Sequence, residues 1–334
     1  MNKPAIPLFK ELIAVALLGL FFYLFLFIDI GDSVEVPKSF LNLNTIFLSI
    51  VLEAIPFILL GVFVSALIQT FVSEEAIQRF LPKNAIVALL PAALLGAIFP
   101  ICECAIVPIV RRLIKKGMPL HVGVVFLVGA PILNPVVFAS TYYAFQSSTE
   151  IVYARMGLAF VLSIVIGFIM YMIFKNRDQL KWSKEELVGR VKAEEGLKDV
   201  GKIKSTLFHA SDEFFEMGKY LLIGAFIASL FQTFLDRSVL IGLGSNEFSS
   251  PAIMMAFAFI LSLCSEADAF VAASFGSTFS AASIIAFLVY GPMLDLKNAF
   301  MLFAFFRAKF VLIFMLVVTV AVYVAVILYQ QILL

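Results

Sequence analysis

Seven long apolar runs constrain this chain more than any other feature of its sequence. Each approaches or exceeds the about 20 residues that an α-helix needs to cross a bilayer, and none shows the alternation typical of a membrane β-strand. Lipid cannot satisfy backbone polar groups, so only helices and closed barrels span it. We therefore predict an all-α polytopic membrane protein with about 7–9 transmembrane helices. The runs cover residues 9–30, 43–73, 120–146, 150–174, 213–236, 279–296 and 299–330, and two less regular apolar stretches cover 85–110 and 251–275.

The composition excludes most soluble classes of protein. Hydrophobic residues make up 62% of the 334 residues and charged residues 14%, whereas soluble domains are about 45–50% apolar and about 25% charged. A balance of 24 Lys and Arg against 23 Asp and Glu leaves a net charge of +1, which excludes a nucleic-acid binder. Three cysteines are too few for a disulfide framework.

Basic residues predict the orientation, because cytoplasmic loops are rich in Lys and Arg. Residues 1–36 contain an apolar run without a cleavage site, so we expect a signal-anchor helix. Residues 176–210 form a predicted cytoplasmic loop, since residues 175–204 hold nine Lys and Arg against six acids. Four basic residues between 111 and 116 also suit the cytoplasm. A re-entrant hairpin over residues 85–110 reconciles these positions, and a full crossing that violates the charge rule is the alternative.

Residues 52–72 and 215–235 indicate an internal repeat. At an offset of 163 residues, eight of these 21 positions are identical, and the same offset pairs Glu103 with Glu266. The first helix is expected to start outside and the second at the cytoplasmic loop, so the two halves, 37–175 and 211–334, are predicted to be inverted. Inverted repeats with broken helices are typical of secondary transporters, whose substrates bind near the repeat interface.

The first candidate site is the segment from Pro100 to Pro108, in which Cys102 and Cys104 flank Glu103. Proline disfavours a continuous helix, and seven of the 13 prolines fall between residues 82 and 135. A carboxylate within a membrane segment is a functional hypothesis by default. On a non-helical backbone the two thiols could reach one soft ion, such as copper(I), zinc or a thiophilic metalloid. The alternative is that both cysteines are small buried residues.

Acidic residues give the second candidate site, at Glu266 and Asp268 in an apolar run that also contains Cys264. Two neighbouring acids repel when both are ionised, so we expect one to carry a proton near neutral pH. The alternative is that one of them caps a half-helix.

Two further pairs of positions follow from the repeat and from the prolines. Asn134 and Asp295 each stand three residues after a proline that we expect to break a span. They are candidates for substrate or ion binding. An interhelical hydrogen bond for Asn134, or a cytoplasmic cap or salt bridge with Lys297 for Asp295, is the alternative. Glu53 and Glu216 open equivalent spans and are secondary candidates.

Four motifs in this order resemble the YraQ-like predicted permeases, a family grouped with the arsenic permease ArsP. They are F-P-I-C-E-C-A-I-V-P-I-V-R-R, G-A-P-I-L-N-P, C-S-E-A-D-A-F-V-A-A-S-F and G-P-M-L-D-L-K-N. The resemblance implies a polytopic plasma-membrane permease, and its arsenic branch exports trivalent organoarsenicals. It also implies functional roles for the matching positions, which are Cys102, Glu103, Cys104, Asn134, Cys264, Glu266, Asp268 and Asp295, with the three cysteines as soft-metal ligands.

The leading hypothesis is a secondary transporter that exports a small solute, such as a soft metal ion or a trivalent organoarsenical, driven by protons or membrane potential. A channel, or the membrane subunit of a two-component complex, is the alternative. No cofactor is expected, and a homodimer is left open. The sequence contains no His-Glu-x-x-His or Gly-x-Ser-Gly motif of a membrane protease and no nucleotide-binding P-loop. We therefore do not expect an enzyme or a chain that is itself driven by ATP.

Overall fold

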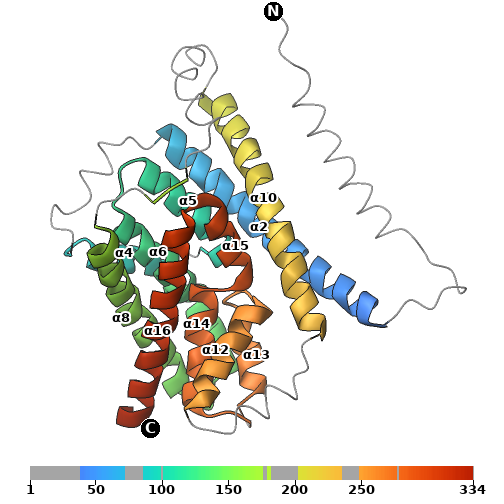
Figure 1. Ribbon diagram of the computed structural model, residues 1–334, viewed down its shortest axis with the longest axis vertical. Coiled ribbons are helices and arrows are strands. Elements are labelled where there is room, and N and C mark those ends of the chain that lie inside the picture. Colours follow the sequence, from blue (N-terminus) through green and yellow to red (C-terminus); the bar gives the residue numbers. More distant parts are fainter. Residues whose placement is uncertain are drawn as a thin grey trace, which may run out of the picture. The chain divides into compact units, whose positions relative to one another are not determined.

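The computed structural model describes residues 38–71, 86–98, 101–175, 179–181, 202–234, 248–276 and 278–333. The predicted signal-anchor, residues 1–36, lies outside these ranges. Within them the regular structure is helical apart from an isolated bridge between Leu180 and Phe306, as the all-α prediction requires. Figure 1 shows the helices, which are α2 (Lys38–Phe71), α4 (Leu89–Ile98), α5 (Glu103–Lys115), α6 (Leu120–Leu133), α7 (Pro135–Ala144), α8 (Thr149–Phe174), α10 (Lys202–Phe234), α12 (Ser249–Leu261), α13 (Asp268–Ser274), α14 (Ala281–Met293), α15 (Leu296–Phe305) and α16 (Ala308–Leu333).

Six helical segments in the described ranges are long and apolar enough to cross a membrane, which confirms a polytopic protein. The segments are Lys38–Ile68, Leu120–Ala144, Thr149–Phe174, Glu213–Phe234, Ala281–Phe305 and Ala308–Ile332. The predicted boundary between the last two spans, at residues 296–299, is wrong. The penultimate segment continues to Phe305, because the buried Asp295 accepts a hydrogen bond from Asn298 N and so begins α15 inside the fold.

Each of the two less regular apolar stretches is divided into two short helices. In the first, the ten residues of α4 end at Ile98 and the 13 residues of α5 begin at Glu103. In the second, 13 residues of α12 and seven of α13 are separated at 262–267. The breaks do not fall at Pro108, Pro131 or Pro292 as predicted, because these prolines lie inside helices, whereas Pro135 does begin a helix. A proline removes only its own backbone donor, and the helices restart instead at the neighbouring residues 102, 134 and 295.

The segment that follows α2 and includes α5 has both of its ends beside the same part of α10. Near the end of α2, Thr70 Oγ1 accepts a hydrogen bond from Thr206 Oγ1 at 2.9 Å. Near the end of α5, Arg112 Nη2 lies 3.1 Å from Glu213 Oε2. Since both contacts are made by the N-terminal half of α10, the segment has its two ends on one side, as a re-entrant course requires.

The two halves of the chain contain the same order of helices, with α2, α4, α5, α6, α7 and α8 followed by α10, α12, α13, α14, α15 and α16. Equivalent long helices run in opposite directions. Phe47 near the start of α2 packs against Phe226 near the end of α10, while the threonine pair joins their other ends. Likewise Phe174 at the end of α8 packs against Phe310 at the start of α16. Opposed directions are what an inverted repeat requires.

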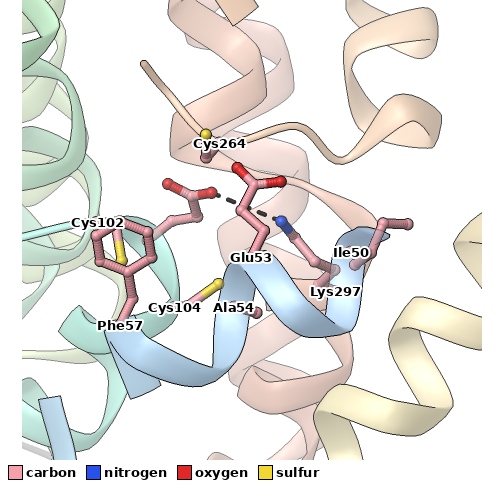
Figure 2. A pocket seen from close by; sticks show the side chains of 9 residues that line it. Ile50, Glu53, Ala54, Phe57, Cys102, Cys104, Cys264 and Lys297 are labelled. Atoms are coloured by element: carbon pink, nitrogen blue, oxygen red, sulfur yellow. Dashed lines mark ion pairs between the residues drawn. The ribbon is translucent and has the colours of Figure 1, made fainter. Parts of the chain in front are cut away.

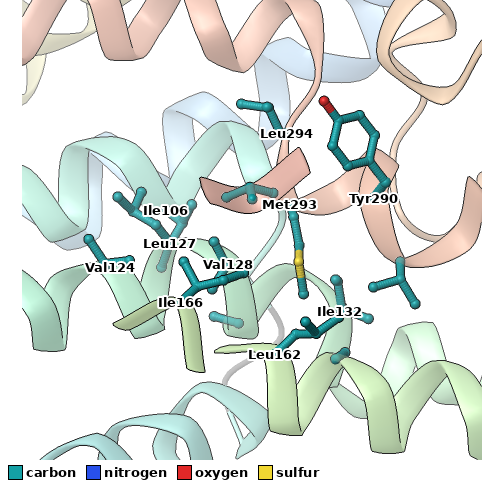
Figure 3. Packing of buried hydrophobic residues seen from close by; sticks show 14 of the residues in the cluster. Ile106, Val124, Leu127, Val128, Ile132, Leu162, Ile166, Tyr290, Met293 and Leu294 are labelled. Atoms are coloured by element: carbon teal, nitrogen blue, oxygen red, sulfur yellow. The ribbon is translucent and has the colours of Figure 1, made fainter. Parts of the chain in front are cut away.

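The core is built around α6 and α14. Every residue of α14 from Ala282 to Met293 is buried, and α6 is buried over nearly its whole length. Figure 3 shows apolar side chains of α5, α6, α8 and α14 packed together there. Leu312 and Leu316 of α16 are more than half exposed, and an apolar outer face of this kind suits contact with lipid.

Candidate functional site

One pocket gathers side chains from four parts of the fold. It encloses about 220 Å³, including its open mouth. We call it the thiol pocket, and its lining residues are Ile50, Glu53, Ala54 and Phe57 of α2, Cys102, Glu103 and Cys104 at the start of α5, Cys264 of the α12–α13 link and Lys297 of α15 (Figure 2). It thus brings all three cysteines of the chain together with two of the predicted glutamates. Glu53 is exposed on α2, and in Figure 2 its carboxylate lies beside the Cys264 thiol.

A buried ion pair lies in the thiol pocket. Lys297 Nζ is 3.7 Å from Glu103 Oε1 and 3.5 Å from Asp295 Oδ2, and all three side chains are at most 5% exposed. Asp295 is held firmly, because it accepts hydrogen bonds from Asn298 N at 2.6 Å and Ser262 Oγ at 2.8 Å. Among the described residues, neither oxygen of Glu103 accepts a hydrogen bond. Glu103 is therefore the carboxylate that is free to take another partner, since a buried unsatisfied oxygen is costly.

The three cysteines are free thiols, and Cys102 and Cys104 are buried. The backbone of Cys102 is extended (φ −76°, ψ 167°) before α5, but Cys104 lies in the first turn of α5, so the predicted non-helical backbone is found for Cys102 and is wrong for Cys104. No group of three or more His, Cys, Asp or Glu side chains in the described residues has the geometry of a metal site. The predicted set of Cys102, Cys104 and Cys264 therefore lines one pocket without forming an assembled metal centre.

Two glycines allow the helices around the thiol pocket to pack closely. A Cβ atom on Gly61 of α2 would lie 2.7 Å from Ala105 Cα, and one on Gly224 of α10 would lie 3.1 Å from Lys297 Cα. These glycines occupy equivalent positions in the predicted repeat. Ala105 is two residues from Glu103, and the second contact is with Lys297 itself. The distance from α2 to α5 and the distance from α10 to α15 therefore affect the geometry of the thiol pocket.

A second buried polar cluster surrounds Arg155 of α8, whose side chain is fully buried. Its Nη2 lies 2.8 Å from Asp268 Oδ2 and 3.1 Å from the carbonyl oxygen of Ser265, while Nη1 donates to Thr141 Oγ1 at 2.7 Å. The predicted acid Asp268 therefore belongs to this cluster and does not line the thiol pocket. Glu266 lies between α12 and α13, two residues from Asp268, and is partly buried.

The structure separates two other predicted residues from the thiol pocket. Asn134 caps α7, with its Oδ1 accepting a hydrogen bond from Val137 N at 2.9 Å, which is a structural role but not the interhelical bond given as the alternative. Glu216 pairs with Arg111 at 3.1 Å, and the Arg111 guanidinium also lies 4.1 Å from the ring centre of Phe305. The equivalent glutamates Glu53 and Glu216 thus lie in different surroundings.

Sequence reasoning missed Lys297 and Arg155. Lys297 was interpreted as a cytoplasmic partner of Asp295, but it is buried and also faces Glu103. Arg155 stands inside the predicted span 150–174, and an ionisable residue within a span is a functional hypothesis by default. That rule, applied to bases as well as to acids, would have selected Arg155.

Comparison with known proteins gives one family over most of the chain. The ArsP_1 family model, described as a predicted permease, matches residues 39–331. The UPF0718 protein YcgR of Bacillus subtilis (strain 168) is 51% identical over 285 residues, which are 85% of this chain and 96% of that protein.

Two further relatives are known from sequence. A protein of Streptococcus mutans named as a two-component membrane permease complex subunit is 38% identical over 283 residues, covering 84% of this chain and 92% of that protein. The UPF0718 protein MJ0584 of Methanocaldococcus jannaschii is 32% identical over 87 residues, 26% of this chain and 23% of that protein. No solved structure matches the chain significantly.

Proposed function

The chain belongs to the ArsP_1 family of predicted permeases, and from this premise we propose that it is a secondary transporter whose solute binds in the thiol pocket. The observation that carries the proposal is Glu103, a buried carboxylate that faces Lys297 among three thiols and accepts no hydrogen bond from the part of the chain that the structure describes. Charges inside a membrane segment are expensive and are typically retained for transport.

The ion pair supports exchange as the mechanism. Without solute, Lys297 balances the charge of Glu103. A solute that carries a positive charge or a thiophilic atom would bind the Glu103 carboxylate in place of Lys297. It would also bind the nearby thiols. Lys297 could then turn fully to Asp295, whose Oδ2 is already 3.5 Å from its Nζ. This exchange keeps a positive charge beside each acid in the low-dielectric interior, where an unpaired charge is most costly.

The thiols favour a soft solute. Thiolate ligands select copper(I), zinc and thiophilic metalloids over hard cations, so a soft metal ion or a trivalent organoarsenical fits the pocket's chemistry. Since the described residues contain no assembled metal site, the thiols would close around such a solute only when it binds. We propose efflux from the cell as the direction, with the plasma membrane as the location.

The two halves, residues 37–175 and 211–334, are proposed to act as inverted repeats joined by the cytoplasmic loop 176–210. The antiparallel pairs α2–α10 and α8–α16 support this arrangement. Two opposed copies of one unit can open a shared site to either side in turn.

A second candidate function is the membrane subunit of a two-component complex. It is favoured by the name of the Streptococcus mutans relative, which covers 84% of this chain. Such a protein would transport only with its partner present, whereas a lone transporter, or a homodimer of this chain, would need no second gene product.

Whole-cell elemental content tests the proposal. Cells that express the chain are challenged separately with trivalent methylarsenical, zinc and copper, and the retained element is measured. We expect the cellular content of one of these elements to be lower in cells that express the wild-type chain than in cells that do not. Glu103→Gln should abolish the fall, because the substituted side chain cannot bind a cation as strongly, and Cys102→Ser/Cys104→Ser should weaken it.

Glu150→Gln provides a matched control, since Glu150 is an exposed acid in the first turn of α8. It should export like the wild type, with equal amounts of each variant in the membrane. Full export by Glu103→Gln would contradict the proposed role of the pocket. If export appears only when a second membrane protein is expressed together with the chain, the two-component function is correct.

A further inference from the structure

The Arg155 cluster contains several buried polar atoms without partners. Among the described residues, Asp268 Oδ1, Ser265 Oγ, Glu266 Oε2 and Arg155 Nε make no hydrogen bond. Arg155, Ser265 and Asp268 are at most 3% exposed. Several unsatisfied atoms at one place are costly in a protein interior and require an explanation, such as an ion, a water molecule or a proton that is taken up there.

The charges around Asp268 do not balance. Arg155 from α8 supplies one positive charge, while Asp268 and Glu266, from the α12–α13 region, supply two negative charges. The helices α7 and α14, which pack on α13, contain no charged side chain. α7 contributes the Thr141 hydroxyl, and the titratable residue of α14, Tyr290, directs its hydroxyl to Thr319 at 2.9 Å. A proton on one acid would make the cluster neutral.

We propose that Asp268 is the site that takes up and releases a proton during transport, with Arg155 as the residue that positions and tunes it. Asp268 keeps one oxygen, Oδ2, on Arg155 at 2.8 Å and leaves the other, Oδ1, free for the proton. The inference rests on the proposed function, because it separates a proton site at Asp268 from a solute site in the thiol pocket.

The position of Arg155 explains how a proton would affect the two halves. Arg155 joins α7 and α8 of the first half to Asp268 and Ser265 of the second. Protonation removes the charge of Asp268 and weakens this connection, while the bond to the Ser265 carbonyl oxygen remains. Proton uptake would therefore favour movement between the halves, and proton release would restore the connection.

Infrared difference spectroscopy of the purified full chain in lipid nanodiscs tests the proposal without any solute. Spectra recorded just below and just above neutral pH, where exposed carboxyls are already ionised, should differ by the carbonyl band of a buried carboxylic acid. We expect Asp268→Asn to remove this band and Glu103→Gln to retain it. Arg155→Met should shift the titration of the band to higher pH by about one unit or more, because the acid loses its cation. Arg155→Lys, which keeps the charge, should titrate near the wild-type pH.

Two results would overturn the inference. One is an unchanged band in Asp268→Asn. The other is an unshifted titration in Arg155→Met, which would leave Arg155 with a purely structural role; if this variant does not fold, the Asp268→Asn spectrum alone decides. If one of these two results is obtained while Glu103→Gln loses export, the proton site is refuted and the proposed thiol pocket is not. If Asp268→Asn removes the band while Glu103→Gln exports fully, the thiol pocket is refuted and the proton site is not.

Discussion

At the scale of single residues, corresponding positions of the two halves share a structural role but differ in charge. Asn134 and Asp295 both accept a hydrogen bond from the backbone amide three residues later, at 2.9 and 2.6 Å. Asp295 adds a charge that faces Lys297 at 3.5 Å, whereas Asn134 adds none. At this pair of positions the charge that faces Lys297 of the thiol pocket is therefore supplied by the second half only.

Replacing Lys297 by methionine should destabilise the protein by about 3–5 kcal/mol, because it leaves Glu103 buried and without its counter-ion. The thermal unfolding temperature in detergent measures this loss. The double variant Lys297→Met/Glu103→Gln should recover part of the stability but not the export, because Asp295 stays buried without Lys297 and keeps only its hydrogen bonds from Asn298 N and Ser262 Oγ. A double variant as unstable as Lys297→Met alone would show that Glu103 is not the charge that Lys297 balances.

At the scale of helices, the thiol pocket depends on how closely two long helices approach two short ones. α2 crosses the start of α5 at Gly61, and α10 crosses α15 at Gly224. Interfaces between membrane helices are rich in small residues, since packing replaces the hydrophobic effect within lipid. The helix starts at which Glu103 and Asp295 lie are therefore held in place by these crossings.

Gly61→Ala should destabilise the protein and reduce export, because the new Cβ would lie 2.7 Å from Ala105 Cα and Cβ, and neither atom can move aside without moving α5. Gly157→Ala in α8 is the matched control, since a Cβ there meets nothing within 4 Å. Alanine favours a helix over glycine by about 1 kcal/mol, so the control should unfold at the same or a higher temperature. Equal unfolding temperatures for both variants would contradict the close crossing.

At the scale of the whole molecule, the sequence predicts the all-α membrane class and the broken helices because both depend on local hydropathy. It does not predict which polar residues meet. Cys264 and Lys297 reach the start of α5 only through the packing of α2, α5, α15 and the α12–α13 link, and sequence spacing carries no signal for that. The end of the penultimate span was also misplaced, since Asp295 and Lys297 were interpreted as interfacial charges although tertiary pairing buries them.

The inverted arrangement predicts that the turns before α8 and before α16 face opposite sides of the membrane. Ser147 precedes α8, while Arg307, which precedes α16, donates its backbone N–H to Gln179 just beyond the other end of α8. The 26 residues of α8 span about 39 Å at 1.5 Å per residue, more than the hydrocarbon core of about 30 Å.

Single cysteines at Ser147 and Arg307 should therefore react differently with a membrane-impermeant maleimide. We expect Ser147→Cys to be labelled in intact cells and Arg307→Cys only after permeabilisation, because Arg307 lies beside residues 179–181, which continue into the predicted cytoplasmic loop. The unmodified chain is the control, since Cys102 and Cys104 are buried and Cys264 lies within the pocket. Labelling of both positions from one side would contradict the inversion of the two halves, and with it the alternating access that the repeat would provide.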